Sequence, residues 1–128
     1  MRTAKGVKTW RLYVVAMIVL TISLWPATGS SEDEGDAARG KKTFTTLCGS
    51  CHGSTGKGDG PAAAALSPKP KDFTNKDYVS KLDDNYLSDI IARGGASVGK
   101  SALMPPFGAS LKDDDIRNVI AYIRSLGK

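Results

Sequence analysis

The chain has 128 residues, enough for one compact domain of ordinary size. Its formal net charge of +5 depends largely on residues 1–29, which hold four of the eighteen Lys and Arg and no Asp or Glu. The rest of the chain has fourteen Lys and Arg and thirteen Asp and Glu, a net charge of +1. The remaining bases are scattered and are not interleaved with aromatic residues, so nucleic-acid binding is not expected.

Residues 1–29 have the pattern of a secretory signal peptide. A basic segment, 1–11, precedes an apolar run of thirteen residues, 12–24, and the small residues Ala27 and Gly29 suit a cleavage site. An uncleaved membrane anchor is the alternative, but thirteen residues are fewer than the roughly 20 that a helix needs to span a bilayer. We therefore expect an exported, periplasmic protein that contacts a membrane only if this leader remains.

The first helix is predicted shortly after the leader. Residues 30–35 are polar and acidic, which is typical of a flexible lead-in, and the compact domain is expected over 36–128. Ser31 and Glu34 match the Ser-x-x-Glu capping box, in which two side chains satisfy free backbone N–H groups at the start of a helix. This pattern predicts a helix that ends near Leu47.

Residues 52–75 are dominated by glycine and proline and predict a wrapping loop with one short helix-prone piece at 62–66. A connection of this length argues against a compact fold unless something large and apolar lies beneath it.

Two further helices follow this loop. Asp83 or Asp84 can cap a helix that Gly94-Gly95 would end. The last helix is predicted over 113–126, because apolar residues recur there at i, i+3, i+4 and i+7 and three aspartates stand at its positive end. No stretch alternates apolar and polar residues, so the expected fold is all-α, with three to four short helices and long loops.

The run Cys48-Gly49-Ser50-Cys51-His52 carries the functional prediction. A disulfide, a thiol-exchange motif and part of a zinc site are the alternatives for two cysteines at this spacing. Structural zinc needs four ligands and the run supplies three, while thiol oxidoreductases place their motif after a strand. Haem attachment explains all three residues, because each thiol can join one porphyrin vinyl group and the adjacent imidazole can bind the iron. His52 is also the only histidine in the chain.

The second iron ligand is expected to be Met104. The other two methionines lie in the leader, and no other histidine exists. Filling a gap in the core is the alternative role for an isolated methionine. Pro105 and Pro106 stiffen the segment beside Met104. His and Met ligation would fill both axial positions and raise the reduction potential, which suits electron transfer better than catalysis.

The chain resembles the class I, single-haem c-type cytochromes of bacteria over residues 34–126. The motifs that carry the resemblance are Gly40 and Phe44 before Cys48-x-x-Cys51-His52, then Gly58-x-Gly60-Pro61, Gly94-Gly95, Met104-Pro105-Pro106-Phe107 and Ala121-Tyr122-Ile123.

The resemblance implies the cytochrome c fold around one haem c attached through Cys48 and Cys51. It implies that Gly40 lies where the first helix crosses the last, near Phe44 and Tyr122. It also implies that the Pro61 carbonyl accepts a hydrogen bond from Nδ1 of the histidine ligand.

The chain departs from some relatives in one respect. Both of its tryptophans lie in the leader, so no tryptophan of the exported chain can hold a haem propionate. Tyr78, Tyr86 or Arg93 are the candidates to replace it.

The expected function is that of a monomeric electron carrier that docks transiently to redox protein partners and is not an enzyme. Four lysines, Lys57, Lys69, Lys71 and Lys100, are candidates for steering that docking, although lysines in loops are usually only solvated. Two alternatives stay open: a haem enzyme or gas sensor in which Met104 dissociates from the iron, and a cytochrome subunit of a larger redox complex.

Overall fold

The computed structural model describes residues 34–128; the predicted signal peptide and residues 30–33 of the lead-in lie outside them. In chain order the elements are α2 (Ala37–Leu47), α3 (Gly49–His52), the 3-10 helix η2 (Pro61–Ala65), α4 (Lys76–Val79), α5 (Asp84–Arg93), the 3-10 helix η3 (Gly95–Val98) and α6 (Asp113–Leu126). No strand occurs in residues 34–128, which confirms the all-α prediction. The five α-helices exceed the predicted number because α3 and α4 are single turns, too short for a hydrophobic period to reveal.

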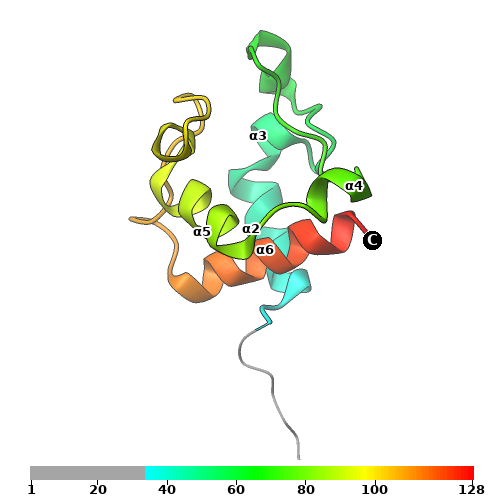
Figure 1. Cartoon of the computed structure of the whole chain (residues 1–128), viewed down its shortest axis with the longest axis vertical. Helices are drawn as coiled ribbons and strands as arrows, with labels where there is room; N and C mark the ends of the chain where they lie inside the picture. The colour runs from blue at the N-terminus through cyan, green and yellow to red at the C-terminus, as the bar shows by residue number, and fades with distance from the viewer. Residues whose placement is uncertain (1–33) are drawn as a thin grey trace, which may run out of the picture. The chain divides into compact units, whose positions relative to one another are not determined.

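Helices α2 and α6 cross at close range in the centre of the fold (Figure 1). Gly40 makes this approach feasible, because a Cβ atom there would lie 1.8 Å from the Asn118 carbonyl oxygen. Beside the crossing, the rings of Phe44 and Tyr122 meet edge to face with centroids 5.2 Å apart. The predicted contact of the first and last helices at Gly40 is therefore confirmed.

The start of α2 differs from the prediction. Asp36 is the N-cap, and its carboxylate accepts hydrogen bonds from the N–H groups of Ala38 at 2.8 Å and Arg39 at 3.1 Å. Gly35 has a positive φ of 65°, so the chain turns between Glu34 and the helix, while Ser31 of the predicted capping box lies outside the described residues.

A contact with α6 accounts for this choice of cap. The Asp36 N–H donates to the Asn118 side chain at 2.6 Å, which ties the beginning of α2 to the last helix. Local sequence patterns contain no information about such a contact.

The ends of α5 and α6 agree with the sequence. Asp83 caps α5 by accepting from the N–H groups of Asn85 and Tyr86, and Gly94 ends the helix. Helix α6 occupies the predicted residues, and the Asp115 carboxylate accepts from the Lys112 N–H at 3.1 Å.

Arg124 joins α6 to the end of α4, the start of α5 and the connection between them. Its guanidinium donates to the carbonyl of Val79 at 2.6 Å and to that of Leu82 at 2.5 Å, and it pairs with the Asp84 carboxylate. These bonds hold α6 to the α4–α5 region from outside the apolar core.

Candidate functional site: a haem pocket

A cavity of about 670 Å³ lies between the helices and the two long loops. Its wall includes Phe44 of α2, Leu87 and Ile91 of α5, and Val119 and Ile123 of α6, all of which are buried. Among the described residues that line it there is no Asp or Glu. A cavity of this size and apolar character suits a cofactor.

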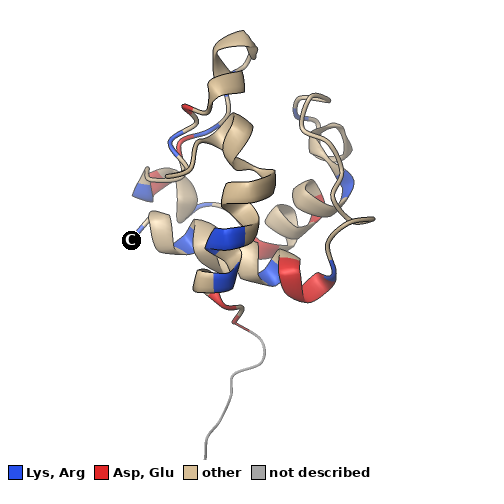
Figure 2. Ribbon diagram, turned by 180° about the vertical axis from the view of Figure 1, so that it is seen from behind, with Lys and Arg blue, Asp and Glu red and all other residues tan. Residues whose placement is uncertain are grey.

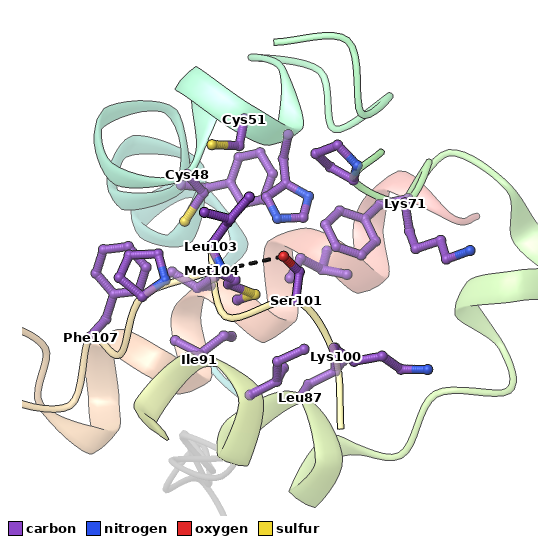
Figure 3. Close-up of a pocket in the computed structure, with 18 of the residues that line it drawn as sticks. Cys48, Cys51, Lys71, Leu87, Ile91, Lys100, Ser101, Leu103, Met104 and Phe107 are labelled. Carbon is purple, nitrogen blue, oxygen red and sulfur yellow. Dashed lines mark hydrogen bonds between the residues drawn. The ribbon is translucent and has the colours of Figure 1, made fainter. Parts of the chain in front are cut away.

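Helix α3 presents the attachment residues on one side of this cavity (Figure 3). The N–H groups of Cys51 and His52 both donate to the Cys48 carbonyl, at 3.2 Å and 2.9 Å. Residues at i, i+3 and i+4 share one face of a helical turn, so the two thiols and the imidazole are directed to the same side. Gly53 ends the turn with φ of 78°.

The loop after α3 completes the hydrogen bonding of this turn. Gly58 donates its N–H to the His52 carbonyl at 2.8 Å, and Gly60 donates to the Cys51 carbonyl at 3.3 Å. A Cβ atom at Gly60 would lie 2.4 Å from the Ser50 carbonyl oxygen, so only glycine allows this approach. The glycine-rich loop therefore holds η2 and Pro61 against α3.

The His52 imidazole lies among aromatic side chains. It stacks on Phe73 with centroids 5.0 Å apart and an interplanar angle of 16°, and Phe44 lies 6.1 Å away. Burial lowers the pKa of His52, an effect that a backbone group of Lys71 opposes. The neutral form is therefore favoured, which is the form that binds metal.

Nδ1 of His52 is buried and has no hydrogen-bond partner in the described part of the chain. The predicted bond from Nδ1 to the Pro61 carbonyl is thus not formed in this structure, although η2 packs against α3. A buried nitrogen without a hydrogen-bond partner destabilises the folded chain. If the other ring nitrogen held a metal, the ring could turn so that Nδ1 gains a hydrogen bond, which would remove that cost.

Met104 lines the same cavity from the loop between η3 and α6. Figure 3 shows it between Cys48 and Cys51 on one side and Ile91 of α5 on the other. Its N–H donates to the Ser101 carbonyl at 3.2 Å, and its carbonyl accepts from the Gly95 N–H at 3.0 Å. The structure thus brings a thioether into the cavity that receives the imidazole and both thiols.

The environment of the cysteines argues against the other uses of their spacing. Burial and the neighbouring Cys51 raise the pKa of Cys48 to about 11, whereas reactive thiols have lowered values of roughly 3.5–7.5. The two thiols are not joined to each other. Within residues 34–128 no group of three or more His, Cys, Asp and Glu side chains could hold a metal ion, so a zinc site is not supported.

Comparison with known proteins agrees with this geometry. The profile of the family described as Cytochrome c matches residues 37–127. The chain belongs to the cytochrome c family. It is an electron-transfer protein, and its cofactor is haem c, bound covalently through Cys48 and Cys51.

Two relatives match the cytochrome over most of their own length. It is 33% identical to cytochrome c-554(547) of Halothiobacillus neapolitanus over 72% of this chain and 98% of that protein. It is 30% identical to cytochrome c6 of Picosynechococcus sp. over 88% of this chain and 91% of that protein.

Two further matches involve larger proteins. The cytochrome is 33% identical to the cbb3-type cytochrome c oxidase subunit FixP of Bradyrhizobium diazoefficiens over 72% of this chain and only 28% of that subunit. It superposes with a TM-score of 0.57 and 25% identity on a chain of the Kuenenia stuttgartiensis reducing HAO-like protein complex, covering 81% of this chain and 48% of that one. The fold therefore occurs both as a separate protein and as part of a larger chain.

The candidates for holding the propionates do not all reach the cavity. Tyr78 and Tyr86 line it, and burial raises the pKa of Tyr78 above its usual value, with a further contribution from Tyr86. Arg93 does not line it and instead pairs with Asp89 at 2.6 Å. The structure therefore does not place Arg93 at the cavity, because its last-turn position directs it to an acid one turn earlier on the same helix.

Three of the four candidate docking lysines line the cavity, namely Lys69, Lys71 and Lys100, while Lys57 does not. Phe73, which stacks on the His52 imidazole, was not predicted from the sequence. An isolated aromatic residue at the end of a glycine- and proline-rich loop is the only signal that could have found it.

Proposed function

We propose that this cytochrome is an exported carrier of single electrons whose haem iron is bound by His52 and Met104. The observation that supports this most directly is the common cavity, in which the only histidine and the only methionine of the described residues face the two attachment thiols. The haem supplies reversible one-electron exchange at its iron. His52 and Met104 would hold the iron, and the apolar wall of the cavity would exclude water from it.

Each ligand has a distinct physical role in this proposal. A thioether stabilises ferrous over ferric iron and so raises the reduction potential. His52 would hold the iron from the side of the attachment cysteines, and a hydrogen bond from its Nδ1 to the Pro61 carbonyl would strengthen it as a ligand. If His52 and Met104 both hold the iron, they would leave no site on it for a substrate, so we propose a carrier and not an enzyme.

The test of this ligation compares two adjacent side chains. Met104→Ala should let the reduced protein bind carbon monoxide and should lower its reduction potential. Leu103→Ala is the matched control, because Leu103 is 64% exposed and its loss leaves the thioether in place. If Met104→Ala retains the optical spectrum and the carbon monoxide behaviour of the unmodified protein, Met104 is not a ligand.

We also propose that redox partners dock at the mouth of the cavity. The exposed side chain of Leu103 and the half-buried Leu66 provide apolar contact there, and lysines stand around them without an acid among the described lining residues. Three aspartates gather instead at the first turn of α6, seen as a red band in Figure 2, and do not line the cavity. A partner with an acidic rim around its own redox centre fits this surface.

Charge reversal tests the docking proposal. Changing the three lysines that line the cavity, Lys69, Lys71 and Lys100, to Glu should slow electron transfer to an acidic partner by about tenfold or more at low salt and abolish its decline with added salt. Lys41→Glu with Lys42→Glu is the control, because both lysines are exposed on α2 away from the cavity. Equal effects of the two sets, or an unchanged salt dependence in the first, would contradict the proposal.

Export rests on residues 1–29. Among residues 34–128 the structure contains no helix with the length and apolar character of a membrane span. We propose that the leader is cleaved and that the protein acts as a periplasmic monomer. The intact mass of the protein recovered outside the cytoplasm tests the cleavage. We expect a mass that corresponds to one haem and a chain that begins near residue 30. A mass that includes the leader would indicate an anchored form.

A second candidate role is that of a subunit in a larger redox complex. The similarity to FixP and to a chain of the HAO-like complex favours it. Stable co-purification with a second redox protein at high salt would support this role, whereas a free monomer would support the diffusing carrier.

A further inference from the structure

The loop that carries Met104 is held to the end of α5 by backbone hydrogen bonds. Before Met104, the Lys100 N–H donates to the Gly95 carbonyl at 2.8 Å. After it, the N–H groups of Phe107 and Gly108 donate to the carbonyls of Ile91 and Ala92, each at 2.9 Å. The carbonyls of Ile91 and Ala92 belong to the last turn of α5, where no intrahelical donor is available, whereas Gly95 is the first residue of η3. The loop is therefore fastened to the start of η3 before Met104 and to the end of α5 after it.

Two glycines between α5 and η3 leave no room for a side chain. Gly94 has φ of 81°, and a Cβ atom there would lie 2.9 Å from the Met104 carbonyl oxygen. Gly95 has ordinary backbone angles for any residue, but its Cβ atom would lie 2.2 Å from the Ser101 carbonyl oxygen and 3.3 Å from Cβ of Met104. At Gly95 the obstacle is purely steric.

Ser101 contacts both Gly95 and the backbone of Met104. Its carbonyl oxygen, which faces Gly95, also accepts the Met104 N–H at 3.2 Å, and its Oγ accepts the Leu103 N–H at 3.2 Å, the dashed line in Figure 3. Any displacement of the Ser101 carbonyl must therefore move the backbone of Met104.

We propose that Gly94, Gly95 and Ser101 act together as the Met104 anchor, a set of positioning residues that determines whether the thioether stays on the iron. The inference rests on the proposed ligation by Met104. A side chain at Gly95 has to displace either α5 or the loop. Helix α5 is held in the core by Leu87 and Ile91, which are 3% and 4% exposed, whereas Leu103 of the loop is 64% exposed. The loop moves outward and carries Met104 away from the cavity.

Carbon monoxide binding to the reduced holoprotein measures this movement. Gly95→Ala should increase the fraction of haem that binds carbon monoxide by about tenfold or more, as expected for overpacking at a rigid contact. It should also remove the optical signature of His/Met ligation while far-ultraviolet circular dichroism stays helical. Gly49→Ala is the matched control, because its Cβ atom would have no neighbour closer than 3.8 Å.

A milder pair of variants protects the test against a folding failure. Ser101→Ala removes one hydrogen bond beside Met104 and should raise carbon monoxide binding by roughly two- to tenfold. Ser110→Ala is its control, since in the described part of the chain the Ser110 hydroxyl makes no hydrogen bond. If Gly95→Ala folds and binds carbon monoxide no better than Gly49→Ala, the proposal is overturned. If Gly95→Ala does not fold, the proposal is overturned when Ser101→Ala and Ser110→Ala bind the same fraction of carbon monoxide.

Met104→Ala separates this proposal from the ligation on which it rests. Strong carbon monoxide binding in Met104→Ala with wild-type behaviour in Gly95→Ala overturns only the role of the anchor. No change in Met104→Ala itself overturns both proposals.

Discussion

Replacing Gly40 with alanine tests the crossing of α2 and α6 that supports the back of the haem cavity. The new Cβ atom would lie 1.8 Å from the Asn118 carbonyl oxygen, while ordinary contact begins at 3.4 Å, so the helices must separate by about 1.6 Å, the difference between these distances. The obstacle is backbone and cannot rotate away. Overpacking of this kind costs about 3 kcal/mol, and the gain of roughly 1 kcal/mol for removing a glycine from a helix leaves a net loss of about 2 kcal/mol.

Denaturant unfolding of the holoprotein, followed by far-ultraviolet circular dichroism, measures this loss. Gly49→Ala is the control, because it removes a helical glycine without a collision and should leave the free energy of unfolding equal or slightly higher. The two variants should therefore differ by about 2–3 kcal/mol. A difference below about 1 kcal/mol would mean that the two helices can part without loss, and the reasoning from Gly40 would be refuted.

Three further predictions concern other parts of the molecule. Arg124→Gln should lower the free energy of unfolding by about 1–3 kcal/mol, because it leaves two backbone carbonyls without their donor. Arg117→Gln is the control in the same denaturant titration; it loses only an exposed ion pair and should cost under about 1 kcal/mol. Hydrogen bonds from the hydroxyl and N–H of Thr74 lower the pKa of Asp72 below its usual 3.8. The stabilisation that the ionised Asp72 gives is therefore present above pH 3.8 and is lost as the pH falls through the lowered pKa. In Thr74→Val, NMR titration should show the Asp72 pKa returning part of the way to 3.8, and no return would contradict this cause. A chain prepared without haem should lose cooperative thermal unfolding, because its apolar cavity wall would face water; a cooperative transition like that of the holoprotein would refute this.

Long amphipathic elements could be predicted from the sequence with correct bounds. The period of α6 and the aspartates at its start determine its residues locally, and Asp83 with Gly94 does the same for α5. The attachment face of α3 follows from the spacing of its cysteines and histidine. These features depend on neighbours within one or two turns, which a sequence pattern contains.

Other features depend on residues far apart in the chain and could not be predicted. The cap of α2 is selected by Asn118, 82 residues away from Asp36. Arg124 donates to two carbonyls more than 40 residues away, and no pattern within its own helix indicates these bonds. The crossing at Gly40 was predicted correctly only through family resemblance, because a glycine within a helix has many uses.

The covalent bonds and the Met104 loop have separate consequences for function. Attachment through Cys48 and Cys51 keeps the haem in the chain whether the loop is closed or open, so the loop is not required to retain the cofactor. Exposed loops open locally at a smaller free-energy cost than a buried core. A carrier requires this opening to be rare, whereas a gas-binding protein requires it to be frequent. The backbone bonds of Phe107 and Gly108 to α5, with the close contact at Gly95, oppose opening from both ends of the loop and so favour the carrier over the sensor within the same fold.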